Sequence, residues 1–425
     1  METLFHGVPV VVLIGGVLAL YMAWAVGAND VANAMGTSVG SGALTVRGAI
    51  VVAALFEFSG AFLVGGHVTD TIRSGILDPA ALAGSADLFV YGMLAALASA
   101  GTWLVFATWL GWPVSTTHSI VGAIIGVGIA IAGGAAVQWG KVGEIVASWI
   151  TSPLLGGAIA FAIFTVVRRT ILDHDDPAGQ ARRIGPLFFF WVFFTIGLVT
   201  LFKGLKNLGL DLDLVESTLL AALLGVLGAG IGAFFLRRVR LEPGLPPIGE
   251  PGLRFGAVER LFGVLQVLTA CAVAFAHGSN DVANAIGPLA AVVNTAATGE
   301  IAGKSAVAPW MLAVGGLGIV VGLATYGYRV METVGRRITE LTPSRGFAAE
   351  LAAATTIVVA SRLGIPVSTT HILVGAVLGV GLARGIGALD LRVVGRIVLS
   401  WLATLPTGAL LAGFFYYFFK GLLGP

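Results

Sequence analysis

Two phrases each occur twice in the chain, in the same order. GANDVANAMG at 27–36 is matched by GSNDVANAIG at 278–287, and PVSTTHSIVGAIIGVG at 113–128 is matched by PVSTTHILVGAVLGVG at 366–381. Self-similarity at one offset, about 250 residues here, is the signature of a duplicated structural unit. The sequence therefore predicts two copies of one fold, at 1–167 and 261–425, joined by a linker and insertion at 168–260.

The low charge of the chain indicates that lipid is the solvent of this fold. Only 11% of the residues are charged and 57% are hydrophobic, whereas soluble domains carry roughly 25% charged residues. A long chain with so few charges cannot solvate a globular surface, and a bilayer removes that requirement. The net charge of +2 gives no reason to expect a nucleic-acid partner. The single cysteine, Cys271, excludes an intrachain disulfide and argues against a cysteine-based metal site.

Apolar runs predict about twelve membrane segments. A spanning helix needs about 20 mostly apolar residues. The runs lie near 8–28, 47–66, 88–110, 115–134, 142–167, 186–204, 217–236, 261–279, 308–328, 350–363, 368–384 and 393–420. The segments at 350–363 and 368–384 are short enough to be half-spans, so we expect broken or re-entrant helices. The first run is expected to be a retained span, because no Lys or Arg precedes it. The expected fold class is an all-α polytopic membrane protein.

The basic residues predict the orientation of these segments. With the N-terminus outside, most of the 24 Lys and Arg residues fall on the inner side, as the positive-inside rule requires. Both termini are then expected outside a cell (inner or plasma) membrane. The first repeat has five segments, and a central two-helix insertion adds two more. Because seven is odd, the second repeat enters the membrane from the opposite side. Inverted repeats of this kind are common in secondary transporters.

The ND phrase places acids and amides within apolar runs. An ionised aspartate at mid-membrane costs on the order of 2.5–3.5 kcal/mol or more, so it usually has a partner or a function. No Lys or Arg is present in either phrase, and carboxylate and amide oxygens suit a hard cation such as Na⁺. The predicted cation ligands are Asn29, Asp30, Asn33, Asn280, Asp281 and Asn284. The alternative is that these residues are helix caps at a membrane surface.

The PVSTTH phrase is typical of a helix start. Pro113 and Pro366 end what precedes them, and Ser115 and Ser368 are suited to cap a new helix. A helix start offers free N–H groups and a positive dipole end, which together form an anion site without a fixed positive charge. The predicted anion ligands are Ser115, Thr116, Thr117, Ser368, Thr369 and Thr370, with Asn29 and Asn280 assigned to the anion as well. The alternative is ordinary capping of two membrane helices.

Two acids and two histidines remain to be interpreted. Glu57 lies inside a predicted span and Glu350 at the head of another, so both are candidates for coupling cation or proton movement to transport. His118 and His371 close the two PVSTTH phrases, and we interpret them as packed residues that each donate one hydrogen bond. Proton coupling and metal binding are the alternatives for these histidines.

At these phrases the chain resembles the inorganic phosphate transporter family (PiT). That family carries a GANDxANA phrase in each half and a PVSTTH phrase downstream of each. The stretch GAFLVGGHVTDTIRSGI, residues 60–76, and Glu57 just before it are similar to the family as well. The resemblance covers almost the whole chain. It implies a symporter that moves phosphate with Na⁺ or H⁺, or as a metal–phosphate complex with H⁺, with no bound cofactor.

Two other functions stay open from the sequence. Some relatives of this family carry sulfate, so a sulfate permease of the same fold is the alternative. A more distant alternative is an intramembrane metal-dependent hydrolase that uses His118, His371, Asp30 and Asp281, although no HExxH motif supports it. The sequence does not fix the oligomeric state, and a homodimer is one of the states that it allows.

Overall fold

The computed structural model describes residues 4–5, 8–65, 76–82, 84–203, 212–238, 256–301, 307–363 and 367–424. These residues are almost entirely helical, with a two-residue pairing of β1 (Leu4–Phe5) and β2 (Val8–Pro9) near the N-terminus. The first repeat holds α1 (Val10–Val26), η1 (Gly27–Val31), α2 (Ala32–Gly40), α3 (Val46–Val64), η3 (Pro79–Leu82), α5 (Ala86–Trp109), α6 (Thr116–Ala132), η4 (Gly134–Ala136), α7 (Trp139–Val167) and η5 (Arg168–Leu172). The central insertion is formed by α8 (Pro177–Lys203) and α9 (Leu214–Arg238). The second repeat holds α10 (Gly256–Thr298), α11 (Pro309–Tyr326), α12 (Tyr328–Glu332), η7 (Thr333–Arg337), α13 (Pro343–Leu363), α14 (Thr369–Arg384), η8 (Ile386–Ala388) and α15 (Leu391–Leu423).

The prediction of an all-α polytopic membrane protein is confirmed. Within the described residues, nine helices are long and apolar enough to cross a membrane, and α6 and α14 are shorter apolar helices. Each predicted run coincides with a helix. The run at 350–363 was expected to be a half-span, but α13 there has 21 residues and is neither among the nine candidate spans nor among the shorter apolar helices. The largest difference is α10, which was expected to end near residue 279 and instead continues to Thr298 over 43 residues.

The two short helices have matching ends. Ser115 and Ser368 are extended and accept hydrogen bonds from the backbone N–H of His118 and His371, so both serines cap their helices as predicted. At the other end the chain turns at Gly133 and Gly385, whose φ angles of 78° and 111° favour glycine. The same capping chemistry therefore limits α6 and α14 to less than a full span.

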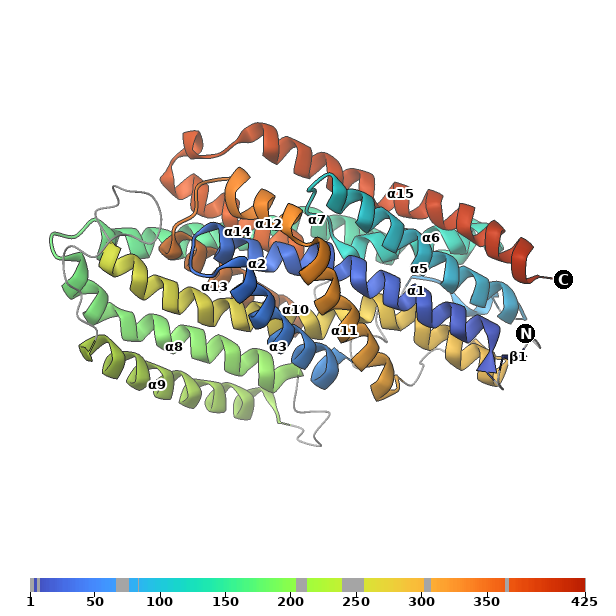
Figure 1. Cartoon of the computed structure of the whole chain (residues 1–425), viewed down its shortest axis with the longest axis horizontal. Coiled ribbons are helices and arrows are strands. Elements are labelled where there is room, and N and C mark those ends of the chain that lie inside the picture. The colour runs from blue at the N-terminus through green and yellow to red at the C-terminus, as the bar shows by residue number, and fades with distance from the viewer. Residues whose placement is uncertain are drawn as a thin grey trace.

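The most extensive helix contacts between the repeats occur in pairs: where a helix of the first repeat packs on a helix of the second, the two corresponding helices also pack with the repeats interchanged. α1 packs on α11 and α10 on α3; α6 packs on α15 and α14 on α7; α5 packs on α15 and α13 on α7. Figure 1 shows both chain ends at one end of the molecule, with α1 running away from that end and α10 running toward it. The opposite directions of α1 and α10 agree with the predicted inversion, and the full inverted-repeat layout stays a prediction. The orientation of the chain in a bilayer, and the domain limits at 167 and 261, stay predictions.

Glycines allow the closest of these crossings. A Cβ on Gly27 would overlap the carbonyl of Ile319 in α11, and a Cβ on Gly278 would overlap the carbonyl of Glu57 in α3. These are the glycines that open the two ND phrases. Small residues let helix backbones approach closely in membranes. The first phrase therefore packs closely on α11 and the second on α3.

Candidate functional site

Both ND phrases lie within continuous helical backbone, deep in the bundle. In the first repeat the phrase forms η1, a π-helical turn between α1 and α2, and in the second it lies inside α10. Asp30 is 2% exposed and Asp281 is fully buried. The alternative that these residues cap helices at a membrane surface is therefore wrong. A π-turn inside an α-helix is frequent at functional sites.

Asp30 lies at the starts of both short helices. Its Oδ2 accepts hydrogen bonds from the Thr116 hydroxyl (2.5 Å) and from the Thr116 backbone N–H (3.4 Å), and its Oδ1 accepts from the Thr370 hydroxyl. Thr116 opens α6 of the first repeat and Thr370 lies in the first turn of α14 of the second. One carboxylate thus joins the two PVSTTH phrases.

Asp281 and Asn284 complete the cluster from the second repeat. Asp281 Oδ2 accepts from the Thr369 hydroxyl at 3.4 Å, and its Oδ1 accepts from the Asn280 amide at 3.1 Å. The Asn284 amide nitrogen lies 3.1 Å from Thr116 Oγ1, 3.5 Å from Thr117 Oγ1 and 3.4 Å from Asp281 Oδ1. Residues predicted for the cation and residues predicted for the anion are therefore in direct contact.

Asn29 makes a different set of contacts. Its amide donates to Thr108 Oγ1 (2.9 Å) and to the Trp112 carbonyl (3.0 Å), and its Oδ1 accepts from the Val114 N–H (3.1 Å). These bonds hold the loop that leads into the first PVSTTH phrase. The side chain of Asn33 and the residue Pro366 lie outside the described part of the chain.

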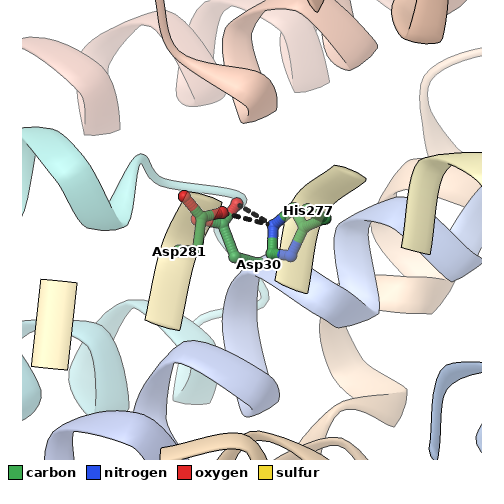
Figure 2. Close-up of side chains that lie close together, drawn as sticks. All are labelled: Asp30, His277 and Asp281. Atoms are coloured by element: carbon green, nitrogen blue, oxygen red, sulfur yellow. Dashed lines mark ion pairs between the residues drawn. The ribbon is translucent and has the colours of Figure 1, made fainter. Parts of the chain in front are cut away.

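His277 lies beside three acids, and Figure 2 shows two of them, Asp30 and Asp281, on one side of its ring. Its Nε2 is 2.7 Å from Asp281 Oδ2 and 3.7 Å from Asp30 Oδ1, while its Nδ1 is 3.3 Å from Glu57 Oε2. The donor atoms of Asp30, His277 and Asp281 all lie within 4.8 Å of one another, in a group that could hold a metal ion.

The sequence interpretation missed His277, although one signal was present. His277 stands one residue before the second ND phrase, where the first copy has Val26, and four residues before Asp281 on the same helix face. A comparison of the two copies for identical residues passes over position 277, because the copies differ there.

The two coupling candidates lie in separate clusters. Glu57, 1% exposed, joins the His277 cluster. Glu350, fully buried, accepts hydrogen bonds from Thr37, Ser38 and Thr269 at 2.6–2.7 Å, and from Gln266 at 3.1 Å. The Glu350 carboxylate is therefore satisfied by neutral donors from α2 and α10, away from the other acids.

His118 and His371 pack on each other and on tryptophans. Their ring centroids are 4.8 Å apart in an edge-to-face contact, and His371 stacks on Trp401 at 3.8 Å. This packing agrees with the interpretation as packed residues, but within the described residues neither ring nitrogen of His371 has a hydrogen-bond partner. In the same part of the chain, the metal-type group contains His277 and neither of these histidines. Among the described residues, the group that could hold a metal ion therefore does not include the two histidines that the hydrolase alternative uses.

Known proteins of similar sequence and structure fit this architecture. The family described as "Phosphate transporter family" matches residues 26–412. A "Putative phosphate permease" of Haemophilus influenzae is 48% identical over 407 residues, covering 96% of each chain. "Inorganic phosphate transporter 2-1, chloroplastic" of Arabidopsis thaliana is 44% identical, covering 95% of this chain and 71% of its own. A solved structure, "The sodium-dependent phosphate transporter", has a TM-score of 0.85 and 40% identity, covering 97% of this chain and all of that one.

Proposed function

The chain belongs to the phosphate transporter family, and from this premise we propose that it imports inorganic phosphate across a cell membrane by symport with Na⁺. The name of the structural neighbour, sodium-dependent, supports Na⁺ over H⁺ as the coupling ion. The single observation that carries the proposal is the meeting of both aspartates with the threonines of both PVSTTH phrases.

The charges of the cluster explain why phosphate needs a cation there. Asp30, Asp281 and Glu57 are three acids around one base, His277, and all four side chains are at most 3% exposed. Ionised groups within a membrane are costly unless they are paired, and phosphate adds further negative charge. Cations bound by the aspartates would balance the negative charge of the acids and that of phosphate. Phosphate binding would then depend on cation binding, which couples the transport of the two ions.

The proposed roles follow the two halves of the cluster. The cation is held by Asp30 and Asp281, with amide oxygens from Asn280 and Asn284. Asn29, whose Oδ1 accepts the Val114 N–H, and Asn33, whose side chain lies outside the described residues, are assigned to the cation from the repeated phrase alone. The anion is held at the starts of α6 and α14 by Ser115, Thr116, Thr117, Ser368, Thr369 and Thr370, with Asn29 and Asn280 nearby. In this structure the hydroxyls of Thr116, Thr369 and Thr370 donate to the aspartates. Once cations bind the aspartates, these hydroxyls and the backbone N–H groups would be free to donate to an anion. His277 positions the two aspartates, and Glu57 and Glu350 are the coupling candidates.

Uptake into proteoliposomes tests the proposal. Labelled phosphate and labelled sulfate are supplied in turn, while the Na⁺ gradient and the pH gradient are imposed separately. We expect phosphate accumulation driven by the Na⁺ gradient, with little sulfate uptake. Accumulation driven by the pH gradient alone would reject Na⁺ coupling, and preferential sulfate uptake would support the permease alternative. Absence of uptake of either anion by correctly folded protein would refute the proposal as a whole.

A further inference from the structure

A pocket of about 700 Å³ lies between η7 and the start of α15, apart from the buried cluster. Residues 336–340 form one wall and residues 387–392 form the other, and neither wall contains a residue assigned to the transported ions. The walls are joined by the Asp390 N–H bonded to the Ile338 carbonyl (3.0 Å) and by the Thr339 hydroxyl bonded to the Ala388 carbonyl (2.8 Å). The pocket is therefore held in shape by its own hydrogen bonds.

The charges in this pocket favour an anionic ligand. Of its three arginines, Arg337 pairs with Glu332 at 2.8 Å, whereas Arg336 and Arg392 make no ion pair within the described residues. The two acids of the lining are already engaged. Glu340 pairs with two arginines outside the lining, and Asp390 accepts the backbone N–H groups of Arg392 and Val393 as the cap of α15. Two exposed guanidinium groups thus remain for a ligand.

The position of the pocket indicates what kind of anion this is. α15 is a candidate membrane span by length and composition and begins at Leu391, so we expect Arg392 to lie near the edge of the bilayer. One aliphatic side chain of the lining, Leu391, is 60% exposed next to Arg392, and Ile386, which directly precedes the lining residue Gly387, is 67% exposed. Basic pockets beside membrane helices suit lipid head groups, and the arginine fork matches the oxygens of a phosphate.

We propose that this pocket binds the phosphate group of an anionic phospholipid, held by Arg336 and Arg392, with the acyl chains against the aliphatic side chains. Because η7 and α15 both contact the ligand, lipid binding links the segment after α12 to the last helix of the second repeat. The pocket is then a second phosphate-recognising site, chemically distinct from the proposed buried one because it uses arginine where the buried site uses hydroxyls and backbone N–H groups.

Binding to the purified full-length protein tests this proposal. The labelled protein in detergent is titrated with dioctanoyl phosphatidylglycerol, with zwitterionic dioctanoyl phosphatidylcholine and with glycerol 3-phosphate. The variant is R336Q/R392Q, and the matched control is R183Q/R237Q, which removes the same charge from exposed helix ends outside the pocket. Because all four arginines are exposed, we expect normal folding, checked by size exclusion and thermal unfolding.

We expect phosphatidylglycerol to bind the wild type and the control alike, and R336Q/R392Q at least ten-fold more weakly, since two charged contacts are lost. Equal binding to all three proteins would overturn the proposal, as would equal affinity for phosphatidylcholine. Arginine-dependent binding of glycerol 3-phosphate alone would overturn the lipid assignment in favour of a soluble ligand. These titrations measure no uptake, so their outcome is independent of the proposed cargo.

Discussion

Replacing Thr116 by valine separates a binding role of this hydroxyl from a capping role. The Thr116 hydroxyl lies 2.5 Å from Asp30 Oδ2 and 3.1 Å from the amide nitrogen of Asn284, so it connects the aspartate of one repeat to the asparagine of the other. Valine keeps the shape of the side chain and removes both bonds. The cap of α6 stays intact, because the capping side chain is Ser115.

The contacts set the size of the effect. In the proposed bound state the Thr116 hydroxyl donates to phosphate instead of to Asp30. Loss of a hydrogen bond to a charged group costs about 1.5–3 kcal/mol, which corresponds to a roughly ten- to hundred-fold rise in the phosphate concentration that gives half-maximal uptake. The repeat-related Thr369 makes one long contact, 3.4 Å to Asp281. We therefore expect Thr369→Val to change the phosphate dependence less than Thr116→Val does.

Initial rates of phosphate uptake at fixed, saturating Na⁺ measure this difference. The matched control is Thr151→Val, because the Thr151 hydroxyl is exposed and donates only to the Ala147 carbonyl of its own helix at 3.4 Å. The control should transport like the wild type. If Thr116→Val shows an unchanged phosphate dependence at normal expression, the repeated hydroxyls are structural, and the anion binds elsewhere.

Three further predictions concern charge, packing and topology. Asp30→Asn and Asp281→Asn should each abolish or strongly weaken Na⁺-driven uptake while the protein still inserts, because each carboxylate supplies charge to a bound cation; an unchanged Na⁺ dependence of uptake would show that the residue is wrongly assigned. Gly278→Ala should destabilise the protein by about 1–3 kcal/mol, because the added Cβ overlaps the backbone of α3. Its thermal unfolding midpoint in detergent should be lower than that of the control Gly413→Ala, whose added Cβ meets open space. Equal midpoints would contradict the close crossing. In a variant without the native cysteine, Asp175→Cys should react with a membrane-impermeant thiol reagent only from the cytoplasmic side, and labelling on intact cells would reject the predicted orientation.

The positions of the helices were largely predictable, because an apolar run or a repeated phrase can be recognised from neighbouring residues in the sequence. Helix starts were predictable for the same reason: a proline followed by a serine fixes the first turn by chemistry within a few residues. The length of α10 was not predictable in this way. Its polar GSND phrase and Pro288 are typical of a helix end, yet the backbone stays helical through them in a helix that packs against α3 and α13.

The site was predictable where the repeats agree and not where they differ. Asp30, Asp281 and the threonines stand in identical phrases, so repetition identified them. His277 has no counterpart in the first repeat, and its three carboxylate neighbours come from α3, η1 and α10. The donors around Glu350 are likewise distant, since Thr37 lies 313 residues from it in the chain. Contacts of this range depend on the completed fold.

The exchanged packing of the repeats also dictates how the protein is made. Asp30 contacts Thr370, which follows it by 340 residues. At about 5–20 residues per second, synthesis of that interval takes roughly 20 to 70 s. For much of this time the first repeat is already in the membrane, and Asp30 has Thr116 as a partner, while His277 and Thr370 have not been synthesised. Insertion machinery or water must shield this acid until α14 arrives, so the first repeat matures only with the second.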